Sequence, residues 1–193
     1  MRALTKIRGI SKRILNLGGL MDDLGGYMVE STQRKIQSNI TPGNAPLTRA
    51  VKKGGLTLRD RGQYMASFSH RAGSQQVTIG TNKEQGKIHN LGGEIKPKKA
   101  KALYIPAGAQ TRTLMRRFGM TVSACIKGMK AAGYSIWKSR SGKALLARKD
   151  KGKPFVLFIL KRSVSIPARR HLTIDTQDRT VIRERVKKWI VQR

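Results

Sequence analysis

The most apolar run in the chain is the six-residue segment FVLFIL at Phe155–Leu160. Its length suits a buried β-strand and falls far short of the roughly 20 apolar residues that a membrane-spanning helix needs. The sequence that follows, KRSVSIPARRHL, contains Pro167, which fixes the backbone and cannot donate a hydrogen bond to a sheet ladder. We therefore expect a strand buried in a sheet, starting at Phe155 and ending at Val164.

Helical spacing of apolar residues predicts four helices. Cys125 lies on the apolar face of one of them, so we expect it in the core. Asp22 and Asp23 stand near the start of another, where the helix dipole favours anions. The predicted helices are Leu4–Leu17, Leu20–Ile40, Thr113–Ala132 and a C-terminal helix that begins with the capping-box pair Asp175 and Asp178.

Shorter patterns predict further strands and a polar loop between Leu47 and Gly62. Alternating residues predict a hairpin made of Tyr64–Arg71 and Val77–Thr81. Two more strand-like pieces, Tyr134–Ser139 and Lys143–Arg148, flank a turn at Gly142. Together the elements predict an α+β fold in which a small antiparallel sheet is packed with N-terminal, central and C-terminal helices.

The charge of the chain indicates an anionic partner. It carries 41 Lys and Arg against 10 Asp and Glu, a formal net charge of +31, and such an excess repels itself in an isolated monomer. Nucleic acid, an acidic protein and an anionic membrane would each serve, and the charge alone does not choose among them. The strongest local bias is the tract from Ile95 to Lys149, which has 14 Lys and Arg and no Asp or Glu.

No arrangement of residues points to catalysis. His70, His89 and His171 lack metal-ligand spacing, and no catalytic triad, P-loop or dinucleotide-binding fingerprint is present. The single cysteine excludes an internal disulfide and fits a protein made in a reducing cytosol. We therefore expect no enzymatic activity, no cofactor and no metal.

Three segments, in a fixed order, resemble a known family. They are LRDRGQYMASF, VTIGTNKEQGKIHNLGGEI and, before the C-terminal helix, VSIPARRHL. The Ile-His-polar-x-Gly-Gly pattern at Ile88–Gly93 and the Ile-Pro-Ala-Arg pattern at Ile166–Arg169 resemble the phage virion morphogenesis family, the tail completion proteins of tailed phages. Gln85-Gly86-Lys87 departs from the family's Tyr-Ala before the Ile-His, and Arg170-His171 departs from its Pro-aromatic after the Arg.

The resemblance implies a structural virion protein, made in the host bacterial cytoplasm and located in the neck or at the head-proximal end of the tail. It implies one domain over residues 1–193, in which residues 107–153 form a helix-plus-hairpin elaboration. It further implies a homo-oligomeric ring, with a hexamer favoured over a dodecamer, that contacts neck, tail terminator or tail tube proteins and no membrane. The assembly motif would comprise His89, Gly92, Gly93, Ile166, Pro167, Arg169 and Arg170.

Within this motif, we expect the His89 ring to hold a tight turn at Gly92 and Gly93 by a hydrogen bond to backbone. After the proline, Arg169 and Arg170 would emerge at a rim, where guanidinium groups pair with carboxylates of a neighbouring chain. The alternative for Arg169 is an ion pair inside its own subunit, for instance near Asp175.

The acid-free tract supplies the cations that would meet an anionic partner. An acidic neighbouring protein is favoured, because a densely cationic wall would hold a genome that has to slide past it. Sequence-independent contact with channel DNA is the alternative. The competing function is a basic nucleic-acid-binding protein, either ribosomal-like or a DNA-contacting accessory protein. The cations concerned are Lys96, Lys98, Lys99, Lys101, Arg116, Arg117, Lys127 and Lys130.

Overall fold

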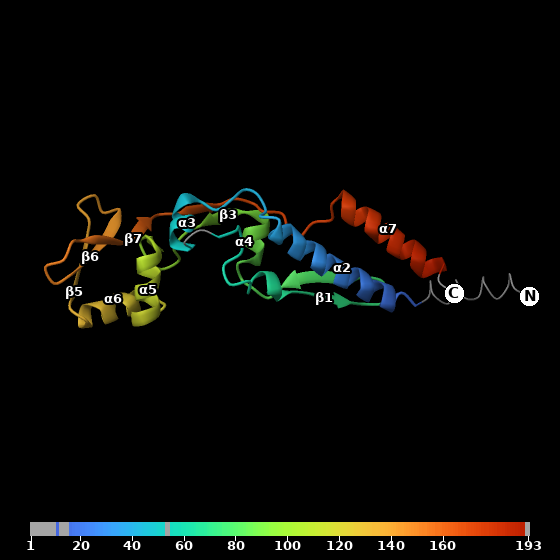
Figure 1. Cartoon of the computed structure of the whole chain (residues 1–193), viewed down its shortest axis with the longest axis horizontal. Helices are drawn as coiled ribbons and strands as arrows, with labels where there is room; N and C mark the ends of the chain where they lie inside the picture. The colour runs from blue at the N-terminus through green and yellow to red at the C-terminus, as the bar shows by residue number, and fades with distance from the viewer. Residues whose placement is uncertain (1–10, 12–15, 53–54, 192–193) are drawn as a thin grey trace, which may run out of the picture. The chain divides into compact units, whose positions relative to one another are not determined.

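The structure, a computed structural model, describes residues 11, 16–52 and 55–191. It consists of helices and small antiparallel sheets, so the predicted α+β class is confirmed, although three separate sheets take the place of the single sheet expected. The chain forms two compact units, whose elements carry the labels of Figure 1. The first unit comprises Met1–Thr41, Thr57–Leu91 and Ala168–Arg193, and the second comprises Pro42–Leu56 and Gly92–Pro167.

The first unit is built on the long helix α2 (Gly18–Gln37). This helix packs on the hairpin of β1 (Phe68–Ala72) and β2 (Val77–Thr81), and on the C-terminal helix α7 (Thr176–Val191). The predicted hairpin and C-terminal helix are confirmed, and the helix predicted at Leu20–Ile40 is present with both ends shifted. The buried side chains of α2 recur every three or four residues and form one apolar face. They include Leu20, Leu24, Tyr27, Met28 and Ile36.

The two aspartates near the start of α2 pair with other elements of the first unit. Because α2 begins at Gly18, Asp22 and Asp23 lie in its second turn, and the predicted place at the helix terminus is wrong. Asp22 Oδ1 lies 2.8 Å from His70 Nε2 on β1, and Asp23 Oδ1 accepts a hydrogen bond of 2.5 Å from Arg185 of α7. The helix predicted at Leu4–Leu17 falls almost entirely outside the described residues.

A buried carboxylate ties α2 to the start of α7. Asp178 Oδ1 accepts hydrogen bonds from Tyr27 (3.0 Å) and Ser31 (2.5 Å) of α2, while Oδ2 accepts from Lys35 Nζ (2.5 Å). The predicted capping box is confirmed, since the backbone N–H groups of Asp175 and Asp178 each donate to the carboxylate of the other, at 3.0 and 2.8 Å. Burial alone would raise the pKa of Asp178, but the hydrogen bonds from Lys35 and the other donors outweigh it and hold that pKa below its ordinary value.

The second unit contains a four-stranded antiparallel sheet in the order β4-β7-β6-β5. The strands are β4 (Leu103–Pro106), β5 (Tyr134–Lys138), β6 (Ala144–Lys149) and β7 (Phe155–Lys161). The apolar run FVLFIL lies in β7, which has a partner strand on each side, as expected for a buried strand. Helices α5 (Ala109–Phe118) and α6 (Val122–Ala131) close a core on one face of the sheet. That core is made of Leu114, Cys125, Met129, Leu145, Ala147, Leu157 and Phe158.

The helix predicted over Thr113–Ala132 is two helices, and glycine explains the break. Gly119 has φ 136°, which side chains rarely adopt, and a Cβ there would stand 2.5 Å from the Cβ of Ala124. Thr121 then starts α6 by accepting the N–H of Ala124 at 3.2 Å. Cys125 is fully buried, as expected, and burial raises the pKa of its thiol.

Two further predictions require correction. The predicted loop at Leu47–Gly62 contains the short helix α3 (Pro46–Lys52). The strand predicted from Phe155 to Val164 divides after Lys161, and its last part belongs to another strand, β8 (Val164–Ile166). That strand pairs with β3 (Gly93–Ile95) in a separate two-stranded sheet. The 3₁₀ turn η1 (Met65–Ser67) and the helix α4 (Gly86–Leu91) complete the fold.

Candidate assembly site

The two motif segments of the sequence meet in the first unit. The carbonyl of His89 accepts a hydrogen bond from the backbone N–H of Arg169 at 3.0 Å. Asn90 Oδ1 accepts two more, from the N–H groups of His171 (3.1 Å) and Leu172 (3.0 Å). One side chain thus satisfies two backbone donors of a segment that is 81 residues away in sequence. We call this set of five residues the motif junction.

A cluster of aromatic rings covers the motif junction. His171 is fully buried, its Nδ1 lies 2.6 Å from the carbonyl of Arg169, and its Nε2 lies 2.8 Å from the hydroxyl of Tyr64. Because a carbonyl only accepts, Nδ1 carries the proton and Nε2 accepts from the tyrosine. The ring of Tyr64 meets those of Phe68, His89 and His171 edge to face, with centroids 5.2 to 5.6 Å apart.

Burial keeps His171 and Tyr64 neutral near pH 7. It lowers the pKa of His171, against the opposing effect of the Arg169 carbonyl, and it raises the pKa of Tyr64 to about 12. A general base needs a pKa near the working pH and access to a substrate. His171 is fully buried and both of its ring nitrogens are engaged within the chain, so the arrangement is structural.

Arg169 does not emerge at a rim, which corrects the sequence-based expectation. It is only 6% exposed, and burial lowers the pKa of its guanidinium. Its side chain therefore lies inside the subunit, while Asp175, the partner suggested for it, pairs with Lys35 at 3.1 Å. Arg170, the next residue, is exposed, as is Pro167 directly after β8. Of the two arginines, only Arg170 presents a side chain that another molecule could reach.

The glycine pair of the motif follows a helix, so the end of α4 takes the place of the predicted tight turn, while the hydrogen bond from the His89 ring to backbone stays a prediction. His89 lies inside α4, and Gly92 ends that helix with φ 73°, in the left-handed region that favours glycine. Gly93 then begins β3 and pairs with Ile166 of β8. The two motif segments therefore pair in two places: as strands β3 and β8 in the second unit, and through the motif junction in the first.

The predicted cations all belong to the second unit and are all exposed. Four lie between β3 and β4, two in the last turn of α5, and two on α6. One of them, Lys96, pairs with Glu94 at 2.9 Å. In the order just given, the residues are Lys96, Lys98, Lys99, Lys101, Arg116, Arg117, Lys127 and Lys130.

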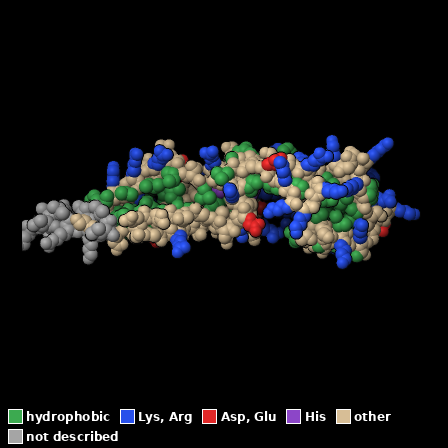
Figure 2. Space-filling view, turned by 180° about the vertical axis from the view of Figure 1, so that it is seen from behind, with side chains coloured by type: hydrophobic (Ala, Val, Ile, Leu, Met, Phe, Trp, Pro, Cys, Tyr) green, Lys and Arg blue, Asp and Glu red, His purple; other side chains and the backbone are tan. Residues whose placement is uncertain are grey.

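The positive charge is unevenly divided between the units. The second unit has 21 Lys and Arg and only two acids, Glu94 and Asp150, which gives a net charge of +19. The first unit has 20 Lys and Arg and eight acids, which gives +12. Figure 2 shows Lys and Arg side chains around the second unit with apolar side chains between them. The second unit is therefore the stronger candidate for meeting an anionic surface.

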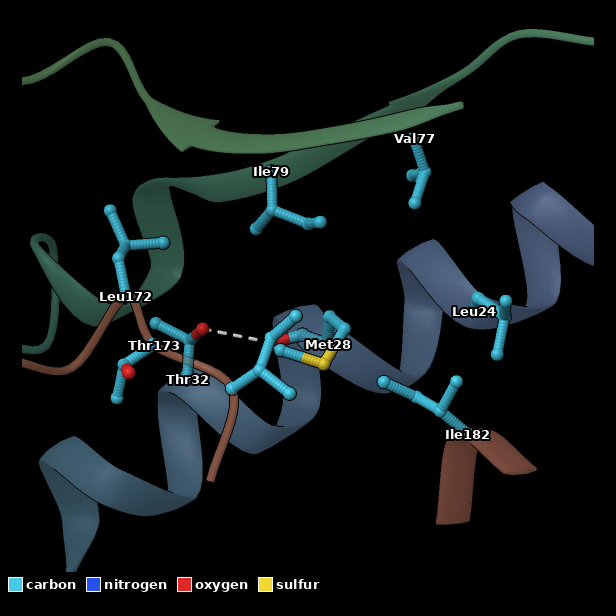
Figure 3. A pocket seen from close by; sticks show the side chains of 9 residues that line it. Leu24, Met28, Thr32, Val77, Ile79, Leu172, Thr173 and Ile182 are labelled. Atoms are coloured by element: carbon cyan, nitrogen blue, oxygen red, sulfur yellow. Dashed lines mark hydrogen bonds between the residues drawn. The ribbon is translucent and has the colours of Figure 1, made fainter. Parts of the chain in front are cut away.

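A groove of about 290 Å³ opens on the first unit between α2, β2 and the segment that leads into α7 (Figure 3). Leu24, Met28, Ile79 and Leu172 contribute apolar side chains to its lining. The hydroxyl of Thr32, also on the lining, donates to the carbonyl of Met28 at 2.8 Å, so it is already engaged within α2. Thr173 adds one further hydroxyl to the lining, so the groove offers few converging polar groups to orient a small-molecule substrate.

Two other kinds of site are absent from the described residues. No group of three or more His, Cys, Asp or Glu among them could hold a metal ion. None of the helices in that part of the chain is long and apolar enough to cross a membrane.

Sequence reasoning missed two residues whose hydrogen bonds hold the motif junction together, Asn90 and Tyr64. Asn90 stood in the motif only as a polar position, and Tyr64 only as an apolar position in a predicted strand. A side-chain amide that accepts two distant backbone donors leaves no local signal. The occurrence of the two motifs in a fixed order along the chain was the one available hint.

Comparison with known proteins gives one match. No curated protein and no solved structure matches the chain significantly. The profile of the phage virion morphogenesis family matches residues 2–191, nearly the whole chain and both of its units. The chain therefore belongs to the phage virion morphogenesis family.

Proposed function

We propose that this protein completes the tail of a tailed phage, or joins tail to head, as a ring of identical subunits. Membership of the family gives it a role in virion structure or morphogenesis and makes it a virion-associated protein. The observation that carries the finer assignment is that the family match spans both units, including the two motifs that pair with each other in the structure. A hexamer is the favoured ring, and a dodecamer is the alternative.

The chemistry of the first unit supports a structural role without catalysis. Its most perturbed groups, Tyr64, His171 and Asp178, are all engaged in hydrogen bonds that connect distant parts of the same chain. Shifted pKa values of this kind also arise in structural networks. The groove between α2, β2 and the segment leading into α7 is mostly apolar, which favours packing over substrate chemistry.

The charge of the chain supports an acidic protein neighbour in the neck, at the tail terminator or at the tail tube. A ring of subunits that each carry +31 repels itself, and carboxylates of neighbouring proteins would offset that repulsion. Sequence-independent contact with DNA in the channel is the secondary partner.

Deletion of the gene from the phage tests the proposal. Complementation in trans should restore infectivity, and electron microscopy of the uncomplemented lysate should show filled heads and separate or unfinished tails. Labelling of an epitope-tagged copy should place it where the tail meets the head. Normal joined particles without the protein, or label confined to another part of the virion, would contradict the assignment.

The competing function is nucleic-acid binding, and the net charge of +31 is the observation that favours it. Binding to duplex DNA of random sequence should then weaken steeply with salt, by about one power of salt for each phosphate contacted. Purified protein that retains tight DNA binding at physiological salt, from a phage that joins heads and tails normally without it, would favour this function over the first.

A further inference from the structure

The four-stranded sheet of the second unit has an apolar face that the core does not use. Helices α5 and α6 pack on the face that carries Leu145 and Ala147. Because side chains alternate along a strand, their neighbour Leu146 points to the opposite face. Its partners across the sheet are Trp137 on β5 and Val156 on β7. The register therefore places three large apolar side chains side by side on the outer face.

A second apolar row continues this outer face toward the other edge of the sheet. Ala144 stands two residues before Leu146, so it points the same way. It pairs with Ile159 of β7, which in turn pairs with Ile105 of β4. The pairing of β6 with β7 shifts register between Leu145 and Leu146 and skips Leu157, so Val156 and Ile159 share this face although they are three residues apart. The apolar stripe thus crosses all four strands of the sheet.

The outer face is open to solvent at its centre. Trp137 is 37% exposed and Val156 is 43% exposed, whereas Leu145 on the core face is 7% exposed. An exposed contiguous apolar patch is the usual mark of an interaction surface, in contrast to single apolar residues scattered over a protein. Aromatic residues are enriched in such surfaces, and Trp137 supplies one here.

Positive charge beside the stripe indicates that its partner is acidic. The guanidinium of Arg148, on the same face as Leu146, lies over the ring of Trp137 at 5.9 Å from its centroid. The whole unit carries +19, so a partner that buries this stripe must be acidic around its own apolar centre. Leu146 and Val156 carry no group that can pair with a phosphate, and phosphate contacts supply most of the affinity for nucleic acid, so the stripe favours a protein partner.

We propose that the outer face of the sheet, centred on Trp137, Leu146 and Val156 and bordered by Arg148, is the surface on which this protein docks an acidic protein partner. The inference rests on the proposed function, in which the chain contacts other virion proteins. It moves the contact away from the helices that carry Arg116 and Lys127, which cover the other face of the same sheet. Docking on the outer face and docking on the helices therefore predict cross-links from opposite faces of the sheet.

Site-specific photo-cross-linking in infected cells separates these predictions. The photoreactive residue p-benzoylphenylalanine replaces Val156 in one full-length variant and Lys127 in a control, since both positions are exposed. Cross-linked products are identified by mass spectrometry, both from whole cells and from purified particles. We expect the Val156 variant to capture an acidic phage protein, and the Lys127 variant to capture several-fold less of it.

Each other outcome overturns a named part of the reasoning. Capture mainly from position 127 would move the docking surface to the helices. Capture from position 156 of another copy of this chain, of DNA or of nothing at all would refute the acidic protein partner. Absence of the protein from purified particles would contradict the proposed function, while the cross-links from whole cells still decide the surface.

A pair of charged variants gives a second measurement. Val156→Arg should lower the yield of infectious particles by about tenfold or more, because a charge buried at an interface costs at least about 1.4 kcal/mol. Lys127→Glu should leave that yield within about twofold of wild type. Both variants should melt near the wild-type temperature, since both positions are exposed. A normal yield from Val156→Arg would refute the proposal.

Discussion

Replacement of Asp178 by Asn should strongly destabilise the first unit. The change keeps the shape of the side chain and removes its charge, while four donors remain around it: the hydroxyls of Tyr27 and Ser31, the ammonium of Lys35 and the backbone N–H of Asp175. An amide has one acceptor oxygen and a donor NH₂ group. The NH₂ group would face donors, and Lys35 would lose the carboxylate that lies 2.5 Å from its Nζ.

The expected cost follows from the burial of this ion pair. The side chain of Asp178 is 2% exposed and that of Lys35 is 18% exposed, so water compensates poorly for the lost partner. Removing one member of a buried pair costs about 3–5 kcal/mol. We expect the lower end, about 3 kcal/mol, because the amide oxygen still accepts and Lys35 keeps Asp175 at 3.1 Å and the Thr173 carbonyl at 2.7 Å. For a chain of this size, that corresponds to a melting temperature lower by about 6–12 °C.

Calorimetry at pH 7 measures the effect, with Glu30→Gln as the matched control. Glu30 lies on the same helix and pairs with Arg34 at 3.9 Å, but both side chains are exposed. The same loss of one negative charge should there cost no more than about 0.5 kcal/mol. A shift for Asp178→Asn as small as that of the control would refute the role given to the buried pair.

The pH dependence provides an independent check on the cause. Since the folded-state pKa of Asp178 lies below its ordinary value, its contribution is complete above the unfolded-state pKa of about 3.9 and is lost as the pH falls toward the folded-state pKa. The stability gap between wild type and Asp178→Asn should therefore be constant from pH 7 to 5 and narrow below about pH 4. A gap that stays unchanged in acid would mean that packing, and not charge, sets the cost.

Three further predictions concern single positions in the first unit. Gly25→Ala should destabilise the protein by about 1–3 kcal/mol, because the new Cβ would stand 2.3 Å from the ring of His70. At Gly26 a Cβ would meet no atom within 4 Å, so Gly26→Ala should stabilise the helix by up to about 1 kcal/mol. Asn90→Ala should cost about 2 kcal/mol in urea unfolding by stranding two backbone donors, and Asn90→Asp, which keeps an acceptor, should recover most of it. Arg169→Ala should lower the free energy of unfolding by about 2 kcal/mol or more, and Arg170→Ala should lower it by less than about 0.5 kcal/mol, because only Arg169 is buried. Equal effects of the two substitutions would contradict the buried placement of Arg169.

Features with a strong local cause could be predicted from the sequence. A run of six consecutive apolar residues is typical of a buried strand. Phe155–Leu160 indeed lies in the interior of its sheet, between β4 and β6. Asp175 and Asp178 form the predicted capping box, because that motif needs only two residues three positions apart. Cys125 is in the core, since the apolar spacing around it is helical and the core face follows from that spacing.

The features that sequence reasoning missed depend on distant residues or on the path of the backbone. Leu114, Phe118 and Val122 keep a spacing of four across the break at Gly119, so periodicity alone continues the helix. Arginine is rarely buried, so a basic pair after a proline indicates surface, yet Arg169 is inside. The outer face of the second unit's sheet depends on which strands pair and in what register, and the sequence did not specify either.

The division of the chain between the two units sets an order for its folding during synthesis. The second unit is complete at Pro167, while the first also requires Ala168–Arg193, which the ribosome delivers after it. Until α7 emerges, the donors of α2 lack the carboxylate of Asp178, and the side chain of Asn90 lacks the backbone of His171. Because domains fold as units while the chain grows, the strongly basic second unit can fold first. Closure of the first unit then follows the folding of the second, which would keep a chain that lacks Ala168–Arg193 from presenting a folded first unit to its partners.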